Sequence, residues 1–319
     1  MKRPMRIRMI CPAPRGTLYG NRISAVRWAR ILRQLGHRVA IRTSYDGAPC
    51  DLMIALHAKR SASAVFEFHN RRPNSPVIVA LTGTDLYRDI RHSKIAQQAL
   101  EVAARLIALQ PLAAGELAPH LRDKLRVIYQ SVEKTRSPAT RRAFQVCVVG
   151  HLRSLKDPFR AAMAAHSLPA ASRIHVVHAG AAMSDQMARQ ARAEEKRNFR
   201  YRWLGEIPRW KTRRLIASSH LLVLSSKMEG GANVISEAIV DGTPVLASRI
   251  PGSVGLLGAD YPGFYPFGDT QALRNLLLRA ETDSMFYREL LSRCAKLSPL
   301  FRPARERAAW KRLLDEVTP

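Results

Sequence analysis

Short apolar runs rich in β-branched residues alternate with amphipathic stretches along this chain, and this alternation constrains the fold more than any other feature. In the first half, the apolar runs predict strands at residues 7–11, 38–42, 52–56, 77–81, 105–109 and 126–129. Residues 22–35 have helical periodicity, with apolar side chains on one side, arginines on the other and Gly36 as the helix stop. Strands that alternate with helices form βαβ units, so we expect a parallel sheet.

A polar segment at residues 133–142, which contains Pro138, interrupts the alternation and predicts a linker. The pattern restarts with strands predicted at residues 145–149, 174–178, 201–204, 221–224 and 244–247, and it ends in a helical stretch at residues 286–317. A chain of 319 residues also exceeds the usual size of one core. We therefore expect an α/β protein with two Rossmann-like domains, residues 1–135 and 136–300, whose parallel sheets face each other across a cleft. A helix at residues 301–319 could cross back to the first domain.

The chain is strongly basic, with 52 Lys and Arg against 25 Asp and Glu and a net charge of +27. A charge of this sign favours nucleic acid, an anionic membrane surface or small polyanionic substrates as partners. Arginines lie in every segment rather than in one block, and no zinc-finger, RRM or basic-zipper pattern is present. We therefore attribute most of the charge to scattered solvated side chains and expect no nucleic-acid partner.

The cysteine and histidine patterns indicate no disulfide framework and no metal site. The chain has four widely separated cysteines, Cys11, Cys50, Cys147 and Cys294. They form no C-x-x-C pair, which favours a reducing compartment. His175 and His178 have odd spacing in a predicted strand, so they point to opposite faces and cannot share a metal.

No segment of the sequence predicts targeting or membrane insertion. The basic start, residues 1–8, is followed by no apolar signal region, and no run reaches the roughly 18 apolar residues of a transmembrane helix. We expect a cytoplasmic protein without stable membrane insertion, and the sequence leaves its oligomeric state open.

The segment with the most specific chemistry is Glu229-Gly-Gly-Ala-Asn-Val-Ile-Ser-Glu237, which follows the strand predicted at residues 221–224. Glycines at a helix N-terminus let backbone N–H groups approach a diphosphate, and the helix dipole favours its charge. We expect Glu229 before the helix and Glu237 about two turns inside it, on neighbouring faces. Carboxylates accept two hydroxyls well, and the vicinal hydroxyls of a ribose or hexose present that pair. The alternative interpretation is a solvated helix start.

This segment resembles the E-x7-E signature of family 4 glycosyltransferases, which have the GT-B fold. The resemblance implies that Glu237 binds the nucleotide ribose and that Glu229 contacts the transferred sugar and takes part in catalysis. It also implies that the intervening residues bind the nucleotide-sugar: Gly230, Gly231, Ala232, Asn233 and Val234.

Further segments extend the resemblance in the family's order along the chain. Gly150-His151-Leu-Arg153-Ser-Leu-Lys156 stands where the family has an Arg and a Lys five apart, which hold the leaving diphosphate. Lys156 matches the Lys, His151 stands at the Arg position, and Arg153 could supply the missing charge. Residues 202–205 resemble the strand end that borders the nucleobase, which adds Gly205 to the donor site. Residues 126–133 resemble the step that ends the first domain, and residues 268–269 stand before a helix, as in the family.

The first domain is expected to hold the acceptor on the loops that follow its strands. The first loop, residues 12–21, contains Arg15 and Gly16, and its turn suits a phosphate, so Gly16 is assigned to the donor. The other candidates follow the third and fourth predicted strands: His57, Lys59, Arg60, Thr82, Thr84 and Asp85. The cations among these residues suit a small anion, and Asp85 or His57 could act as a base or an orienting group.

Four of these segments, at residues 55–62, 81–89, 226–237 and 255–263, are similar to the selenosugar synthases of selenoneine biosynthesis. This resemblance implies a UDP-sugar donor, UDP-N-acetylglucosamine or UDP-glucose, and selenophosphate as the acceptor, giving a 1-selenosugar. The UDP-sugar is then a substrate, and neither a cofactor nor a metal is expected. Two other hypotheses stay open: a family 4 transferase with a carbohydrate or lipid acceptor, and a pair of Rossmann domains that binds nucleic acid or a nucleotide without turnover.

Overall fold

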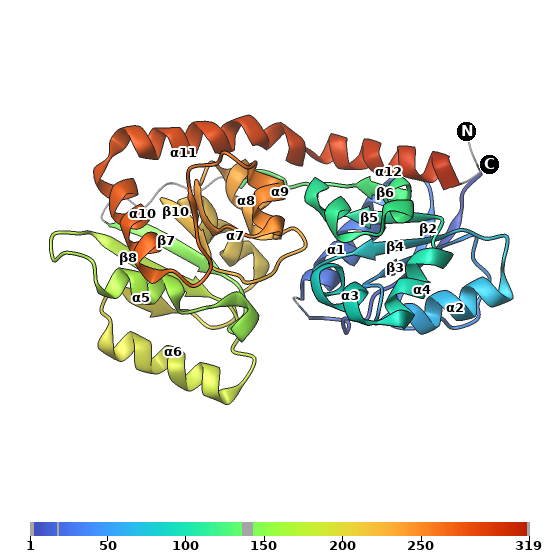
Figure 1. Ribbon diagram of the computed structural model, residues 1–319, viewed down its shortest axis with the longest axis horizontal. Coiled ribbons are helices and arrows are strands. Elements are labelled where there is room, and N and C mark those ends of the chain that lie inside the picture. The colour runs from blue at the N-terminus through green and yellow to red at the C-terminus, as the bar shows by residue number, and fades with distance from the viewer. Residues whose placement is uncertain (1–2, 18, 136–142, 318–319) are drawn as a thin grey trace. The chain divides into compact units, whose positions relative to one another are not determined.

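The computed structural model describes residues 3–17, 19–135 and 143–317, and the chain divides into two compact units. Unit 1 comprises Met1–Ser131, Glu229–Gly231 and Arg302–Pro319, and unit 2 comprises Val132–Met228 and Ala232–Phe301. Each unit contains one six-stranded sheet (Figure 1). Of the predicted linker, residues 136–142 lie outside the described residues, and so does the residue at which the second domain was predicted to start.

The sheet of unit 1 has the strand order β2-β1-β3-β4-β5-β6, and every neighbouring pair is parallel. Its strands are β1 (Arg6–Ile10), β2 (Arg38–Arg42), β3 (Leu52–Leu56), β4 (Val77–Leu81), β5 (Arg105–Ala108) and β6 (Leu125–Val127). The predicted parallel sheet is confirmed, and three of the strands have the predicted bounds.

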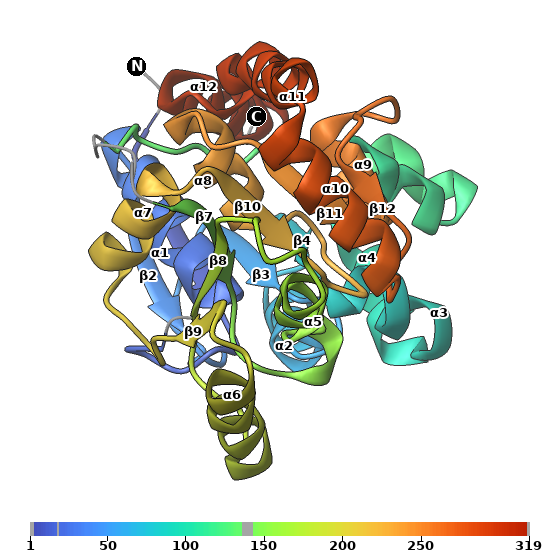
Figure 2. The ribbon, with the colours of Figure 1, turned by 90° about the vertical axis from the view of Figure 1, so that its left-hand side faces the viewer.

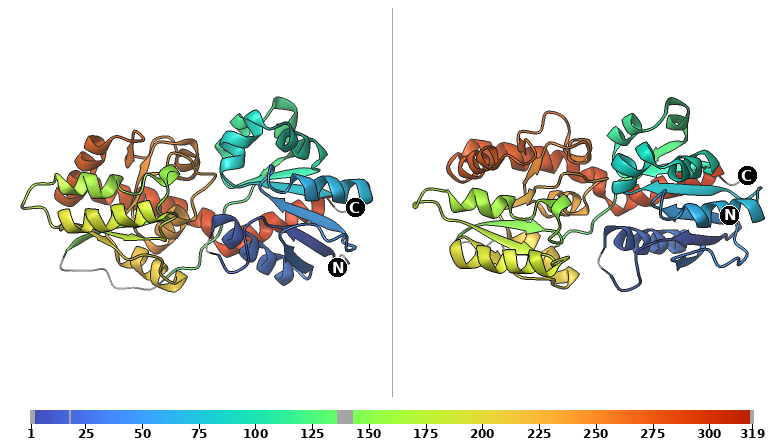
Figure 3. Two further views of the ribbon diagram at one scale, coloured as in Figure 1. Left: turned by 90° about the horizontal axis from the view of Figure 1, so that it is seen from below. Right: turned by 60° about the horizontal axis from the view of Figure 1, so that its bottom comes forward.

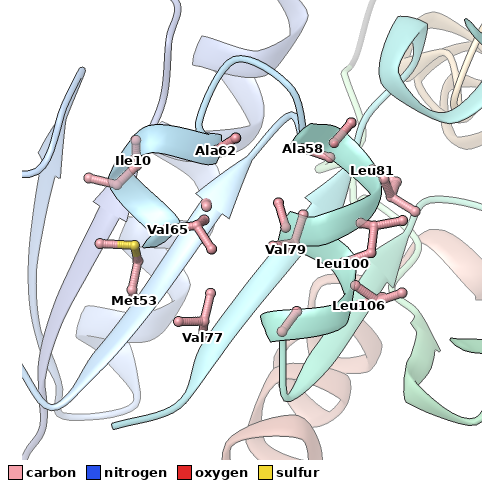
Figure 4. Close-up of a cluster of buried hydrophobic side chains, with 14 of the residues drawn as sticks. Ile10, Met53, Ala58, Ala62, Val65, Val77, Val79, Leu81, Leu100 and Leu106 are labelled. Atoms are coloured by element: carbon pink, nitrogen blue, oxygen red, sulfur yellow. The ribbon is translucent and has the colours of Figure 1, made fainter. Parts of the chain in front are cut away.

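Helices cover both faces of this sheet because its strands are apolar on both sides. In β3, Met53 and Ala55 face a core that includes α2 (Ala62–Arg71) and α4 (Lys94–Val102), shown in Figure 4. The alternate residues Leu52, Ile54 and Leu56 face a second core that includes α1 (Gly20–Gln34) and α12 (Pro303–Val317). Short helical turns complete the unit at Asp85–Asp89, Ile90–His92 (α3), Pro111–Glu116 and Pro119–Lys124.

The last helix, α12, is part of the core of unit 1 and lies beside α1 (Figure 3). The Trp28 and Trp310 rings pack edge to face with their centroids 5.2 Å apart. The buried Glu306 carboxylate accepts hydrogen bonds from Trp28 Nε1 at 3.0 Å and from the Ser131 backbone N–H at 2.8 Å. Burial raises the pKa of Glu306, although Arg27 and these donors oppose that shift. Both apolar packing and a buried polar network therefore attach the C-terminal helix to the rest of unit 1.

The sheet of unit 2 has the order β12-β11-β10-β7-β8-β9, again with parallel neighbours (Figure 2). Its strands are β7 (Phe144–Val149), β8 (Ile174–Ala179), β9 (Tyr201–Trp203), β10 (Leu221–Leu224), β11 (Val245–Ser248) and β12 (Phe264–Tyr265). The sequence missed β12, because a strand of two residues is too short to show alternation.

The helices of unit 2 are α5 (Arg160–His166), α6 (Asp185–Arg197), α7 (Arg209–Ser218), α8 (Asn233–Asp241), α9 (Pro251–Leu257), α10 (Thr270–Thr282) and α11 (Ser284–Leu297). The single helical stretch predicted at residues 286–317 is instead divided. A 3-10 turn at Ser298–Phe301 separates α11 from α12, and Pro303 begins the new helix. Proline suits a first helical position because its missing N–H has no intrahelical partner there.

Candidate functional site

Several of the residues expected to bind the donor follow three strands of unit 2, at their carboxyl ends. His151, Arg153 and Lys156 follow β7, Gly205 follows β9, and the segment leading to Glu237 follows β10. The strand β7 lies between β10 and β8, so the strand order reverses beside it. Open parallel sheets bind ligands at such a point, outside the carboxyl ends of the strands.

The loops after β7 and β8 are in backbone contact. A Cβ atom on Gly180 would overlap the carbonyl oxygen of Gly150, so only glycine fits at position 180. His178 lies beneath this contact, and its Nε2 faces the same Gly150 oxygen at 3.0 Å, which requires a proton on Nε2. Its Nδ1 then accepts from the Tyr201 hydroxyl at 3.1 Å. Burial lowers the pKa of His178 to about 4, so the ring is neutral at pH 7 and acts as a structural donor.

His151 has one ring nitrogen fixed by the neighbouring loop. Its Nδ1 accepts a hydrogen bond from the Ala181 backbone N–H at 3.2 Å. In the neutral ring the proton is therefore on Nε2. Two backbone bonds also join these loops, from Leu152 N–H to Ala181 at 2.8 Å and from Met183 N–H to Leu152 at 3.1 Å. A backbone N–H of the neighbouring loop thus helps to position the half-buried imidazole.

Lys156 ends a 3-10 turn, Ser154–Lys156, that returns toward the end of β7. Its Cδ comes within 3.9 Å of the point that a Cβ atom on Gly150 would occupy. Arg153 precedes this turn and is exposed, whereas Lys156 is half-buried. Asp157 follows with a left-handed backbone, φ 43°, and forms an ion pair with Arg160 at 2.7 Å, which fixes the end of the turn.

The segment after β10 is anchored to the loop after β7. The Lys227 backbone N–H donates to the Leu155 carbonyl at 2.9 Å. The Ser248 hydroxyl donates to the Ser226 carbonyl at 2.6 Å, and the Tyr265 hydroxyl lies 3.0 Å from Ser225 Oγ. These contacts hold the approach to α8 in place.

Helix α8 presents an N-terminus without a side-chain cap. Its N-cap residue, Ala232, has no side chain that can accept the first backbone N–H groups, and the first turn contains no acidic residue. Helix N-termini favour anions through the helix dipole. Gly242, with φ 82°, ends the helix.

Glu237 lies in α8, but nearer its start than predicted. The helix begins at Asn233, so Glu237 is one turn inside it rather than two. Its side chain is buried, and Oε1 accepts from Arg209 NH2 at 3.1 Å. Sequence analysis missed Arg209, which is the first residue of α7 and lies 28 positions from Glu237, too far apart for any local pattern to connect them.

Glu229 precedes α8, as predicted, because the helix begins four residues later at Asn233. Residues Glu229–Gly231 belong to unit 1. A Cβ atom on Gly230 would lie 2.5 Å from the Thr82 carbonyl carbon, and one on Gly231 would lie 2.5 Å from Leu109 Cβ. These glycines are therefore required for close packing, whatever they also offer a ligand.

The residues expected to bind the acceptor lie together at the carboxyl ends of β1, β3 and β4. Arg15 and Gly16 follow β1, and Gly16 has a left-handed backbone with φ 85°. Lys59 and Arg60 follow β3 and are exposed, and Thr82 and Thr84 follow β4 and are half-buried.

Asp85 is fully buried and accepts three backbone hydrogen bonds. Its carboxylate receives the N–H groups of Ala58 at 3.1 Å, Thr82 at 3.0 Å and Gly83 at 2.9 Å. Of the two roles expected for Asp85, base or orienting group, this geometry favours the second, because the carboxylate joins the loops after β3 and β4.

His57 is a buried histidine with a left-handed backbone, φ 74°. Its Nδ1 faces the Arg60 N–H at 3.4 Å, so the neutral ring carries its proton on Nε2, which faces Thr84 Oγ1 at 3.2 Å. Burial lowers the pKa of His57, although Asp85 and Asp89 oppose that shift. Strained backbone of this kind is retained where the surroundings fix it, often at functional sites.

Within the described ranges, no group of three or more His, Cys, Asp or Glu side chains could hold a metal ion. The four cysteines are buried and free. None of the helices that the structure describes combines the length and apolar character needed to cross a membrane.

Comparison with known proteins identifies what these two units resemble. Residues 131–298 match the family described as Glycosyl transferases group 1. Alr3699/HepE from Anabaena, in complex with UDP and glucose, superposes with a TM-score of 0.77 over 98% of this chain and 99% of that chain at 16% identity. Sucrose-phosphate synthase from Thermosynechococcus elongatus superposes with a TM-score of 0.79 over 99% of both chains at 16% identity. A glycosyltransferase from Rickettsia africae gives 0.73 over 99% of both at 12% identity. These likenesses confirm the expected GT-B fold.

Proposed function

This chain belongs to the Glycosyl transferases group 1 family, and from that premise we propose that it transfers a hexose from a UDP-sugar to selenophosphate. The selenium attacks the anomeric carbon, the bond from that carbon to the diphosphate oxygen breaks, and UDP leaves with the electron pair. The products are UDP and a 1-selenosugar, and the transferred hexose is N-acetylglucosamine or glucose.

One observation carries the donor half of this proposal: Glu237 is buried one turn inside α8, a helix that follows the carboxyl end of β10 and has no side-chain cap at its N-terminus. A carboxylate suits the vicinal hydroxyls of a ribose, and the helix N-terminus suits the adjoining diphosphate. A neighbour of the same fold, Alr3699/HepE, was crystallised with UDP and with UDP-glucose, which supports UDP as the nucleotide here. Glu229 would contact the transferred hexose.

The leaving diphosphate requires positive charge as the bond breaks. Lys156 would supply it from the turn after β7, and His151 would donate Nε2–H from the ring position that Ala181 fixes. Arg153 precedes the same turn and would add a second cation. A neutral imidazole at position 151 stabilises an anion less than the family's usual guanidinium does. Arg153 would therefore supply the missing charge, and Lys156 would act as the usual Lys.

The proposed acceptor is a small, multiply charged anion, and the residues of unit 1 suit it. Arg15, Lys59 and Arg60 follow neighbouring strands and are exposed at the same edge of the sheet. Selenophosphate is a soft nucleophile that needs little help from a base. This agrees with Asp85, whose carboxylate is engaged by backbone N–H groups, and with His57, whose Nδ1 already accepts from Arg60. The free cysteines further support a reducing, cytoplasmic location.

A single assay tests the proposal. Purified protein is incubated with UDP-N-acetylglucosamine or UDP-glucose and selenophosphate, UDP release is measured, and a seleniated product is sought by mass spectrometry. The Glu237→Ala variant is the control, and product formation no higher than with that variant contradicts the proposal. UDP release with a sugar or lipid hydroxyl acceptor but not with selenophosphate would instead indicate an ordinary family 4 transferase. Salt-sensitive nucleic-acid binding without UDP release would exclude a transferase.

A further inference from the structure

Two arginine–carboxylate pairs join α7 to α8 at equivalent positions. Arg209 NH2 lies 3.1 Å from Glu237 Oε1, and Arg213 NH2 lies 2.6 Å from Asp241 Oδ2. The arginines are four residues apart on α7, and the carboxylates are four apart on α8, so the pairs form successive connections between the same two helices.

The second pair, Arg213 with Asp241, has an evident structural role. Its side chains are 11% and 0% exposed. Asp241 Oδ1 also accepts the Thr135 backbone N–H at 2.7 Å, and Arg213 donates to the Glu133 carbonyl at 3.1 Å. This pair therefore fixes the beginning of unit 2 against its own helices.

The first pair, Arg209 with Glu237, is more exposed to solvent than the second and lies at a different place in the fold. The Glu237 side chain is 8% exposed, but that of Arg209 is 45% exposed. Arg209 begins α7, four residues after Gly205, on the loop that leaves β9 at its carboxyl end. This connection is thus at the edge of the sheet where the donor residues gather, and the Arg213 connection is one turn farther along α7.

We propose that Arg209 is a positioning residue that holds the Glu237 carboxylate for the ribose diol, and so makes the site selective for ribonucleotides. The inference rests on the proposed function, in which Glu237 binds the ribose. An ionised carboxylate has about four acceptor positions, so it can accept from an arginine and from ribose hydroxyls together. A charge-assisted hydrogen bond also restrains the carboxylate, and a restrained acceptor loses less entropy when both hydroxyls bind.

Calorimetry with UDP and 2′-deoxy-UDP tests this role, because the deoxynucleotide lacks one of the two hydroxyls. Wild-type protein should prefer UDP. In Arg209→Leu, the affinity for UDP should fall about tenfold, as one restrained charge-assisted contact is lost, while 2′-deoxy-UDP binding changes much less. Arg209→Lys should recover part of the preference. Adding Arg209→Leu to Glu237→Ala should have no further effect, because the residue acts through Glu237.

Arg213→Leu is the matched control, because it removes the other pair between the same helices. It should lower the melting temperature more than Arg209→Leu does, and the folded fraction should keep the wild-type preference for UDP. In turnover assays with the UDP-sugar, Arg209→Leu should raise KM for the donor and leave kcat nearly unchanged.

The outcomes separate this inference from the proposed function. A wild-type protein that binds no UDP contradicts the proposed function, and this inference with it. A wild-type protein that binds UDP, with an unchanged UDP to 2′-deoxy-UDP ratio in both Arg209→Leu and Arg209→Lys, overturns the inference alone. If Arg209→Leu does not fold, Arg209→Lys and Arg209→Gln give the same comparison.

Discussion

Gly180 packs directly on Gly150, so that a Cβ atom at position 180 would overlap the Gly150 carbonyl oxygen. This contact joins the loops after β8 and β7, and it holds the start of the loop that carries His151 and Lys156. The two glycines are 30 residues apart in the sequence, and no local pattern there predicts that they touch. A side chain here would have to displace backbone, which cannot move as a flexible side chain can.

Gly180→Ala should therefore destabilise unit 2 by about 2–3 kcal/mol, the usual cost of overpacking, and should weaken UDP binding by shifting the loop that follows β7. Urea unfolding and calorimetry with UDP measure the two effects. Gly115→Ala is the control, because a Cβ atom there meets nothing within 4 Å. Equal stability of the two variants would contradict this account of the contact.

His178 should make stability depend on pH. Burial lowers its folded-state pKa to about 4, whereas an unfolded histidine titrates near 6.5. Between these values the unfolded chain binds more protons, so stability rises with pH through this window and is lost as pH falls. The full contribution is about 3 kcal/mol at 1.36 kcal/mol per pKa unit.

The measurement that isolates His178 is the pH dependence of unfolding in wild type and in His178→Gln, which keeps a side-chain donor for Gly150. The difference between the two proteins should change between about pH 4 and 6.5. His57 and His220 also have lowered pKa values and contribute to both proteins alike. A constant difference across this window would show that His178 does not titrate as its burial requires.

Trp310→Ala should detach α12 from unit 1. The ring is fully buried against Trp28, and truncation of a buried aromatic typically costs about 3–5 kcal/mol. Denaturant unfolding followed by tryptophan fluorescence measures the loss. Lys311→Ala, at the neighbouring exposed position of α12, should change stability by no more than about 0.5 kcal/mol. A small effect at position 310 would mean that α12 contributes little to this core.

Lys156→Ala should reduce turnover more than it reduces stability. If Lys156 holds the leaving diphosphate, kcat should fall about a hundredfold or more, the usual effect of removing one transition-state contact. Thermal unfolding should shift little, because Lys156 is half-buried on a surface turn. Lys156→Arg should retain part of the activity. A collapse of the melting temperature in Lys156→Ala would instead show a structural role.

Turnover should persist in excess EDTA. In the proposed site, Lys156, Arg153 and the N-terminus of α8 provide the positive charge that a divalent ion supplies in metal-dependent transferases. UDP release measured with and without chelator checks this. Loss of activity in EDTA that is restored by added Mg²⁺ or Mn²⁺ would contradict it.

The sequence by itself determined the two parallel sheets. Strands such as β3 and β4 were predicted to the residue, because their apolar runs and the intervening amphipathic helices are local patterns with fixed periods. The glycine-rich step before α8 was also recognised, since a helix start is a local signal, but the helix begins about one turn later than predicted. The same patterns did not predict β12, which is too short, or the break between α11 and α12.

Only the tertiary structure decided which residues meet on the loops at the carboxyl ends of the strands. It placed Arg209 on Glu237, made Asp85 an acceptor for three backbone N–H groups, and set Gly180 against Gly150. It also assigned Glu229 to unit 1 and Glu237 to unit 2. Each of these contacts joins residues that are distant in the sequence and that meet only when a whole unit packs. A periodic pattern predicts a helix or a strand, but it does not predict which distant residue a side chain will contact. The sequence therefore specified most of the strands and the presence of α8. The order of the strands in each sheet decided which residues meet at the carboxyl ends of those strands.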